Sequence, residues 1–149
     1  LMWWMQYPHK ILLAGQTFSV VILGKMGFQV QEVFVEGRKH ISSDVLMRAM
    51  NIQVGQPIFA QDLEELKQKL KNIDWIKSVH IERQLPDQLH IKITERYPIA
   101  IWQHQKKLYL VDREGVVIQE GHVNQFRDLP LVIGPDAPVH TPKILALLE

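Results

Sequence analysis

The 149-residue sequence predicts an α+β fold: a strand, two helices and a β-hairpin, followed by a region rich in short strands. Two segments place apolar residues at helical spacing, and the segments before and after them alternate apolar and polar residues as strands do. The composition, 46% hydrophobic and 22% charged, is that of an ordinary globular protein with a packed core.

The composition also argues against several classes of function. The 17 basic and 16 acidic side chains leave a net charge of +1, so no electrostatic feature favours a nucleic acid as partner. With 0 cysteines, the chain has no disulfide framework, no thiolate nucleophile and no cysteine-based zinc site.

The N-terminal segment, residues 1–26, is expected to be a juxtamembrane linker near the end of a truncated membrane anchor. Trp3, Trp4 and Tyr7 suit a membrane–water interface, and packing of these rings on a domain is an equally good interpretation. The apolar stretch 11–23 is interrupted by polar residues and is shorter than the roughly 20 residues that span a bilayer.

The first strand and helix are predicted between residues 33 and 57. Val33 and Val35 alternate with polar or outward positions, and the strand ends at Gly37. Ser42 is a suitable N-cap for the helix that follows, and the segment 54–57, with its Gly and Pro, is expected to end it. The inner face of this helix is predicted to consist of Val45, Leu46 and Ala49.

A second helix is predicted to begin near Asp62, which can cap it. Its apolar face carries Leu63, Leu66, Leu70 and Ile73. The opposite face is charged, and we interpret it as solvated rather than as a binding surface. Glu64 with Gln68 and Glu65 with Lys69 have the spacing of ordinary i,i+4 pairs on a helix surface.

A β-hairpin is predicted next, with strands over 76–83 and 89–95 and a turn at 85–88. Aligning the apolar faces of the strands predicts four cross-strand pairs: Val79–Ile93, Ile81–Ile91, Glu82–His90 and His80–Lys92. Trp75 lies where the second helix leads into the hairpin and is expected to fill the core. The predicted core comprises Val33, Val35, Leu46, Leu63, Leu66, Leu70, Trp75, Val79, Ile81, Leu89, Ile91 and Ile93.

The chain beyond Arg96 is predicted to form part of a second, β-rich domain. Pro98 interrupts the preceding ladder, and short strand patterns follow at 99–102, 108–111, 116–118 and 131–133. A terminal helix is expected with Thr141 as its N-cap and Pro142 in its first turn.

No residue pattern in the chain predicts an active site, a metal or a cofactor. The seven histidines have no metal-ligand spacing, and no serine lies in a nucleophile motif. His80 and His90 are interpreted as cross-strand surface residues. Asp112 and Glu114 flank a turn, and we interpret them as turn residues rather than as a catalytic pair.

The order of elements and a series of motifs resemble the POTRA module of the FtsQ/DivIB bacterial cell-division proteins, in the forms found in alphaproteobacteria. The motifs are Val33-x-Val35-x-Gly37, Gly55-Gln-Pro-Ile58, Trp75-Ile76-x-x-Val79, Arg83-Gln84-Leu85-Pro86, Glu95-Arg96-x-Pro98-x-Ala100-x-Trp102, Leu110-Val111-Asp112-x-x-Gly115 and Leu129-Pro130-Leu131-Val132-x-Gly134. Each motif alone is weak evidence, whereas together, in order, they are specific. The residues expected to mark the family motifs and the domain junction are Arg83, Pro86, Glu95, Arg96, Pro98 and Trp102.

The resemblance implies a POTRA domain over 27–97, with a three-stranded mixed sheet covered by two helices, and the first part of a truncated β domain over 98–149. It implies a non-catalytic divisome scaffold without cofactors, small-molecule substrates or nucleic acid. The implied partners are FtsB and FtsL and, through them, the septal peptidoglycan synthase. The implied location is the periplasmic side of the inner membrane at the division septum, anchored by a single N-terminal membrane helix.

The family arrangement places the last strand of the module in the centre of its sheet, so the strand over 77–83 has one unpaired edge. Such an edge can bind a partner strand, which makes Lys77, Val79, Ile81 and Arg83 candidate partner-binding residues. Alternatively, Lys77, His80 and Arg83 merely protect this edge against aggregation. Two other functions fit a similar frame: a client-binding POTRA module of an outer-membrane secretion or assembly protein, and an enzyme domain.

Overall fold

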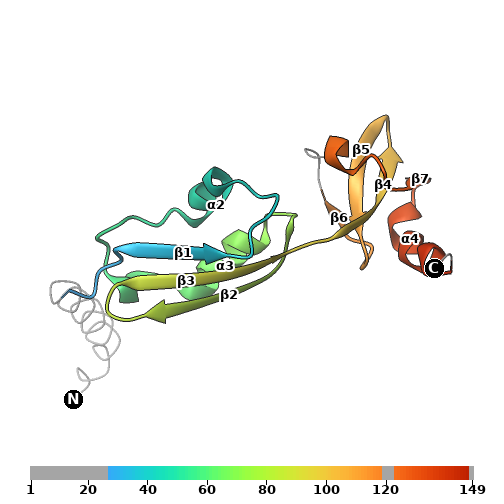
Figure 1. Ribbon diagram of the computed structural model, residues 1–149. Coiled ribbons are helices and arrows are strands. Elements are labelled where there is room, and N and C mark those ends of the chain that lie inside the picture. Colours follow the sequence, from blue (N-terminus) through green and yellow to red (C-terminus); the bar gives the residue numbers. More distant parts are fainter. Residues whose placement is uncertain (1–26, 119–122, 148–149) are drawn as a thin grey trace, which may run out of the picture.

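A computed structural model of the chain describes residues 27–118 and 123–147. The prediction of a juxtamembrane linker over 1–26 lies outside these residues. Figure 1 shows two regions in succession, a three-stranded sheet with its helices and a smaller β-rich region that carries the last helix. Within the described residues, no helix is both long and apolar enough to cross a membrane.

The first region contains a mixed sheet in the order β1-β3-β2, which confirms the predicted α+β fold. Strand β1 (Glu32–Glu36) runs parallel to β3 (Gln88–Glu95), and β2 (Ile76–Gln84) runs antiparallel to it. All four predicted cross-strand pairs are confirmed by the register: Val79–Ile93, Ile81–Ile91, Glu82–His90 and His80–Lys92. Strand β3 is central, so β1 and β2 are the edges.

Gly37 ends β1 for a steric reason. Its backbone has a φ of 86°, a conformation that residues with a side chain rarely adopt. A Cβ atom at this position would also collide with the backbone carbonyl of Ile93. The chain can therefore leave the sheet close to β3 only with glycine here.

The first helix, α2 (Ser43–Met50), is shorter than the sequence predicts. Ser42 caps its start by accepting a bond from the Val45 backbone N–H, and Asn51 ends it in the left-handed conformation, before the Gly-Pro segment. The prediction that Val45 faces inward is wrong, since it is 37% exposed. Met50 is buried instead, because it lies one helical turn after the buried Leu46 and so shares its face.

The second helix, α3 (Leu63–Lys71), begins as predicted. The Asp62 carboxylate accepts bonds from the backbone N–H groups of Glu64 and Glu65. The helix ends before Ile73, so that residue packs on the core from the turn that follows. A short 3-10 turn, η1 (Ile58–Ala60), precedes the helix.

The core lies between the two helices and the inner face of the sheet. Its main cluster contains seven of the predicted residues: Leu46, Leu66, Leu70, Trp75, Val79, Ile91 and Ile93. Leu89 lies in a second cluster with Val30 and Ile58, which sequence analysis did not single out. The remaining predicted core residues, Val33, Val35, Leu63 and Ile81, are only half-buried.

The second region is a four-stranded sheet in the order β6-β5-β4-β7. Its strands are β4 (Pro98–His104), β5 (Lys107–Asp112), β6 (Val117–Ile118) and β7 (Leu131–Ile133), with a 3-10 turn η2 (Val123–Phe126). Neighbouring strands are antiparallel except β4 and β7, which are parallel. Pro98 begins β4 rather than lying before it, and a register shift follows it directly.

The C-terminal helix, α4 (Ala137–Leu145), starts earlier than predicted. Pro138, and not Pro142, occupies its first turn, so Pro142 lies inside the helix. The prediction of Thr141 as an N-cap is wrong: this residue is 2% exposed, and its hydroxyl donates to the Ala137 carbonyl at 2.6 Å. Two prolines, Pro138 and Pro142, suit the first turn of a helix. The Ala137 and Val139 N–H groups donate to the carbonyls of Gly134 and Asp136, so the first turn forms at the earlier proline.

Candidate functional site

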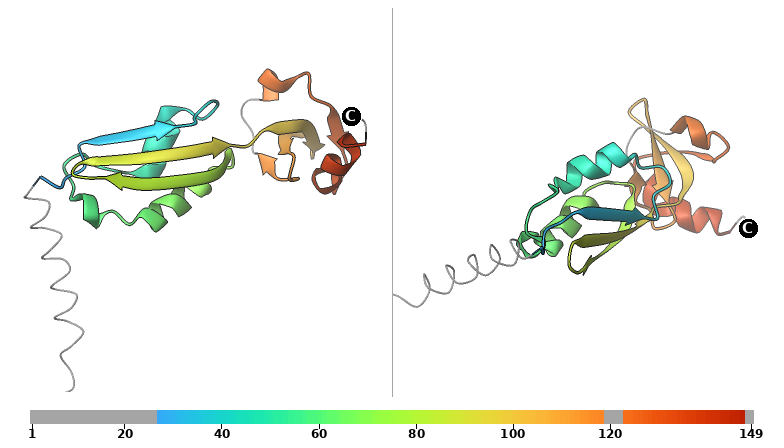
Figure 2. Two further views of the ribbon diagram at one scale, coloured as in Figure 1. Left: turned by 60° about the horizontal axis from the view of Figure 1, so that its bottom comes forward. Right: turned by 60° about the vertical axis from the view of Figure 1, so that its left-hand side comes forward.

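Figure 2 shows the junction of the two regions, where the chain passes from β3 into β4. The structure gathers charged and aromatic residues there. Residues from the loop after β1, from the turn after α3, from the β5–β6 turn and from η2 meet there. The junction has three parts: a buried carboxylate, an ion-pair network and an aromatic cluster. Together they determine how the two regions are held.

The buried carboxylate belongs to Glu95, the last residue of β3. Its side chain is 4% exposed and accepts bonds from three consecutive backbone N–H groups, those of Lys39, His40 and Ile41, at 2.7 to 3.1 Å. The Nδ1 atom of the His40 ring lies 2.9 Å from the other carboxylate oxygen. Glu95 thus holds the loop between β1 and α2 onto the end of the central strand.

This environment acts on the pKa of Glu95 in two opposite ways. Burial raises the pKa, because it disfavours the charged form. The backbone N–H bonds of Lys39, His40 and Ile41 and the contact with the His40 ring lower it, and together they outweigh burial. The pKa of Glu95 is therefore lower than its ordinary value of 4.5, and the carboxylate is charged at neutral pH.

The ion-pair network begins at the next residue. The Arg96 guanidinium lies 2.7 Å from the Asp112 carboxylate, and these side chains are 17% and 4% exposed. Arg96 also lies 3.5 Å from the carboxylate of Glu114, which pairs with Lys77 on β2 at 2.6 Å. The network joins both strands of the hairpin to the β5–β6 turn.

Asp112 has a second role, as a turn residue, which agrees with its interpretation from the sequence. It accepts bonds from the backbone N–H groups of Glu114 and Val116, each at 2.9 Å. The partnership with Arg96 was not foreseen, because sequence spacing does not show which cation faces the turn. The only sequence signal for a buried ion pair here was the adjacent, oppositely charged pair Glu95 and Arg96 at the predicted domain boundary.

The aromatic cluster consists of Trp75, His40 and Phe126. The rings of His40 and Trp75 are stacked with centroids 4.8 Å apart, and Phe126 lies 5.3 Å from His40 and 5.9 Å from Trp75. Beside them, Ile101, Leu110 and Ile118 of the second region belong to the same buried cluster as the core of the first. The hydrophobic core is therefore continuous across the junction.

The predicted partner-binding edge lies on β2, as expected from the position of β3 in the sheet. Val79 is 7% exposed and Ile81 is half-buried, so both face the core. Lys77 contacts Glu114, and Arg83 donates to the backbone carbonyls of Ile58 and Gln61. The four candidate side chains thus have structural contacts, and the edge itself offers its backbone groups.

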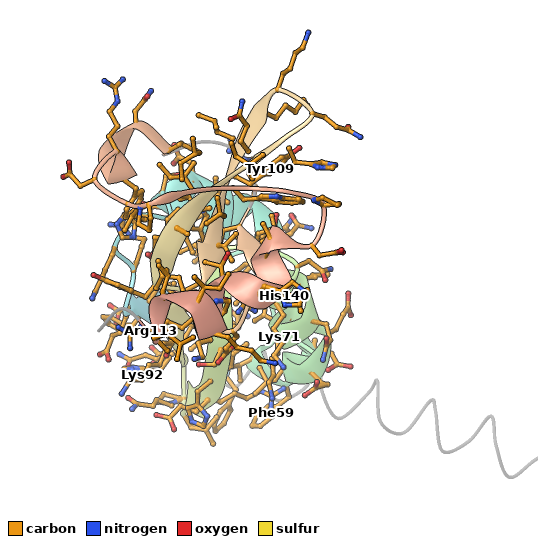
Figure 3. The ribbon with its side chains drawn as sticks, turned by 90° about the vertical axis from the view of Figure 1, so that its right-hand side faces the viewer. Phe59, Lys71, Lys92, Tyr109, Arg113 and His140 are labelled. Atoms are coloured by element: carbon orange, nitrogen blue, oxygen red, sulfur yellow. The ribbon has the colours of Figure 1, made fainter. Side chains whose placement is uncertain are left out.

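The other motif residues serve the framework. Pro86 lies in the turn between β2 and β3, and Pro98 begins β4. The Trp102 indole N–H donates to the Gly134 carbonyl at 2.7 Å, which ties β4 to the end of β7. The ring of Trp102 also packs on Tyr109, which Figure 3 places on β5, with centroids 5.5 Å apart.

No group of three or more His, Asp or Glu side chains suited to a metal ion occurs among the described residues. His80 and His90 lie on the exposed face of the sheet, where His90 packs against Phe34 with centroids 4.8 Å apart. The first sheet also has two edges, the outer sides of β1 and β2.

Comparison with known proteins agrees with this arrangement. Residues 28–96 match the family model described as POTRA domain, FtsQ-type, and residues 100–149 match the one described as Cell division protein FtsQ/DivIB, C-terminal. A protein of Rickettsia felis named Cell division protein FtsQ is 38% identical over 125 residues, which are 84% of this chain and 46% of that protein.

Two further relatives carry the same name. The protein of Zymomonas mobilis is 33% identical over 148 residues, 99% of this chain and 46% of its own length. The protein of Caulobacter vibrioides is 31% identical over 111 residues, 74% of this chain and 37% of its own length. The chain thus spans about half the length, or less, of these curated relatives.

Proposed function

The chain belongs to the FtsQ/DivIB family of cell-division proteins, and we propose that it acts as a non-catalytic scaffold of the divisome in the cell envelope. In this role it links early and late division proteins at the septum through protein–protein contacts. The observation that carries the proposal is the succession of the two matches, a POTRA domain of the FtsQ type over 28–96 and the FtsQ/DivIB C-terminal region over 100–149.

The proposed partners are FtsB and FtsL and, through them, the septal peptidoglycan synthase. The proposed location is the inner membrane, crossed once by an N-terminal anchor, with the POTRA domain (27–97) and the β domain (from residue 98) in the periplasm at the septum. Family membership supports these proposals. The continuous core and the ion pairs of the junction support a scaffold whose two regions present partners in a fixed arrangement.

The second candidate function, a client-binding POTRA module of outer-membrane secretion, has less support. Such a module shares the fold of the first region, whereas the match of residues 100–149 is to the FtsQ/DivIB C-terminal region. An enzyme domain is the weaker alternative still, because the candidate residues at the junction are engaged with one another and with backbone groups.

Within the scaffold we propose the outer edge of β2, residues 77–83, as one partner-binding edge. An edge strand of a sheet offers unpaired backbone N–H and C=O groups to a partner strand. Amide exchange of the intact protein with and without division partners tests this assignment. We expect slower exchange in residues 77–83 with a partner present, and unchanged exchange there would reject the assignment without affecting the scaffold role.

The scaffold role itself is tested in cells with the intact protein carrying a fluorescent tag. We expect localisation at the division septum and co-purification of FtsB and FtsL. A diffuse envelope signal without these partners would contradict the proposal. Co-purification of outer-membrane assembly proteins instead would favour the secretion alternative.

A further inference from the structure

The other edge of the first sheet, strand β1, lies beside an apolar groove that the proposed function does not use. The groove has a volume of about 450 Å³ and is lined by residues of β1, α2 and the loops that follow each of them. Figure 1 shows β1 and α2 on the same side of the first region. Its walls are formed by Val33, Val35, Arg38, Ser43, Leu46, Met47, Met50, Ile52 and Val54. Most of these side chains are apolar, so the groove suits apolar side chains of a ligand.

Two apolar residues of the groove are mostly exposed to solvent. Met47 on α2 is 66% exposed, and Val54 in the loop after α2 is 70% exposed. Val33 and Val35 of β1 are only half-buried, although they lie on the inner face of the sheet. The helix therefore leaves this side of the core partly open, next to the free backbone edge of β1.

A strand added to β1 would fit this geometry in one way. Neighbouring strands in a sheet lie about 4.8 Å apart, and side chains that are opposite each other point to the same face. Residues of the added strand opposite Val33 and Val35 would thus enter the groove. Residues opposite Glu32, Phe34 and Glu36 would lie on the outer, solvated face.

The outer face of β1 determines which strand it accepts. Glu32 and Glu36 are both exposed, and Phe34 between them is 43% exposed. Glu32 accepts a bond from the Gln88 side chain, and Glu36 makes no ion pair within the described part of the chain, although Lys92 is opposite it on β3. Opposite charges at facing positions stabilise a strand pair, so this row favours lysine or arginine.

The same charges argue against a second copy of this chain as the occupant. Antiparallel pairing of two β1 strands about Phe34 would place Glu32 of one copy opposite Glu36 of the other, and like charges directly opposite destabilise a strand pair. Apart from Ser43 and Arg38, which donates to the Ile41 carbonyl, the residues that line the groove are apolar, so the positions that enter it suit apolar side chains.

We propose that the edge of β1 and the adjoining groove bind an extended segment of a partner protein in which apolar residues alternate with lysine or arginine. The apolar side chains occupy the groove between β1 and α2. The basic side chains face Glu32 and Glu36 on the outer face. This site is separate from the β2 edge, so the two assignments can fail independently.

The test uses the intact protein and a synthetic peptide of alternating valine and lysine. Two control peptides are used. One alternates valine and glutamate and so lacks the basic side chains, and the other alternates serine and lysine and so lacks the apolar ones. We expect the valine–lysine peptide to bind about tenfold more tightly than either control, given two facing charge pairs. It should also slow amide exchange in residues 32–36.

Variants locate the site. The double variant E32K/E36K should bind the valine–lysine peptide about tenfold more weakly than the native protein and should gain affinity for the valine–glutamate peptide. The matched control is E82K, which reverses an exposed charge on the same outer face but on β2. It should leave binding of the valine–lysine peptide unchanged, and circular dichroism checks that each variant is folded.

Three outcomes would overturn the proposal. The first is equal binding of all three peptides, which would show that neither the groove nor the charges select the ligand. The second is protection of residues 76–84 in place of 32–36, which would assign the peptide to the other edge. The third is equal weakening by E82K and by E32K/E36K, which would indicate attraction without a defined site.

Discussion

The two regions of the molecule differ in how they bury their apolar side chains. In the first region, two helices cover one face of a three-stranded sheet, and Leu66 and Leu70 are fully buried in the core between the helices and the sheet. In the second region the edge strands β6 and β7 have only two and three residues, and apolar side chains are exposed nearby: Ile133 is 72% exposed on β7 and Leu147 is 86% exposed after α4. The first region also exposes apolar side chains, Met47 and Val54, at the groove beside β1.

This difference shows which region supports the other. Small sheets need packing against a further layer to be stable, and the first region contains that layer. The second region instead shares a buried cluster with the first through Ile101, Leu110 and Ile118. We therefore expect damage to the first region to unfold both, and damage at the junction to release the second.

The largest effect is expected for Trp75→Ala. This ring is 9% exposed and contacts both regions, so its removal leaves a cavity that should cost roughly 3–5 kcal/mol of unfolding free energy. Denaturant titration measures this loss. Trp102→Ala is the comparison, since that ring packs within the second region alone. An equal loss in both variants would contradict the dependence of the second region on the first.

Arg96→Met should cost about 3 kcal/mol, because it leaves the buried Asp112 carboxylate without its cation. Chemical denaturation of single and double variants checks this. Adding Asp112→Asn to Arg96→Met should recover part of the loss, because no uncompensated charge then remains buried. If the two losses simply add, the pair does not act as a unit.

Glu95→Gln should cost about 1–3 kcal/mol at pH 7, because the amide offers one acceptor oxygen to the loop N–H groups and carries no charge. The native pKa of Glu95 is lowered, so its stabilisation is complete above the unfolded-state value and is lost as pH falls through the folded one. The stability difference between the two proteins should thus be constant near neutrality and shrink below about pH 4.5. A stability difference that grows on acidification would mean that folding raises the pKa of Glu95, which would contradict this prediction.

The smallest effect is expected for Lys77→Ala. Lys77 and Glu114 are each about half-exposed, at 49% and 52%, and such surface pairs contribute up to about 1 kcal/mol. The loss should be reduced further in high salt, whereas that of Arg96→Met should persist. Thermal melts at two salt concentrations measure both. Similar salt responses would indicate that the two pairs are equally exposed.

Much of the first region could be predicted from the sequence because its signals are local and agree with one another. Alternation in both hairpin strands permitted one register with matching apolar faces, and that register is confirmed. The caps at Ser42 and Asp62 could be identified in the same way, since a cap depends on residues within one turn.

The errors arose where two local signals compete or where the partner is distant in sequence. Pro138 and Pro142 both suit a helix start. Val45 and Met50 are both apolar and both lie near the buried Leu46 on α2, Val45 beside it in sequence and Met50 one turn later. At the junction, Glu95 bonds residues more than 50 positions earlier, and Phe126 joins Trp75 from the second region. Such pairings depend on the packing of whole elements, which periodicity does not describe.

The central claim is that the junction holds the two regions in one fixed arrangement. Because these 149 residues contain 0 cysteines, Lys71→Cys on α3 and Lys143→Cys on α4 provide two unique sites for spin labels within them. Pulsed electron–electron double resonance should give one narrow distribution of distances between the two spin labels, and this distribution should broaden when Arg96→Met is added. A broad distribution in the protein with native Arg96 would contradict the claim.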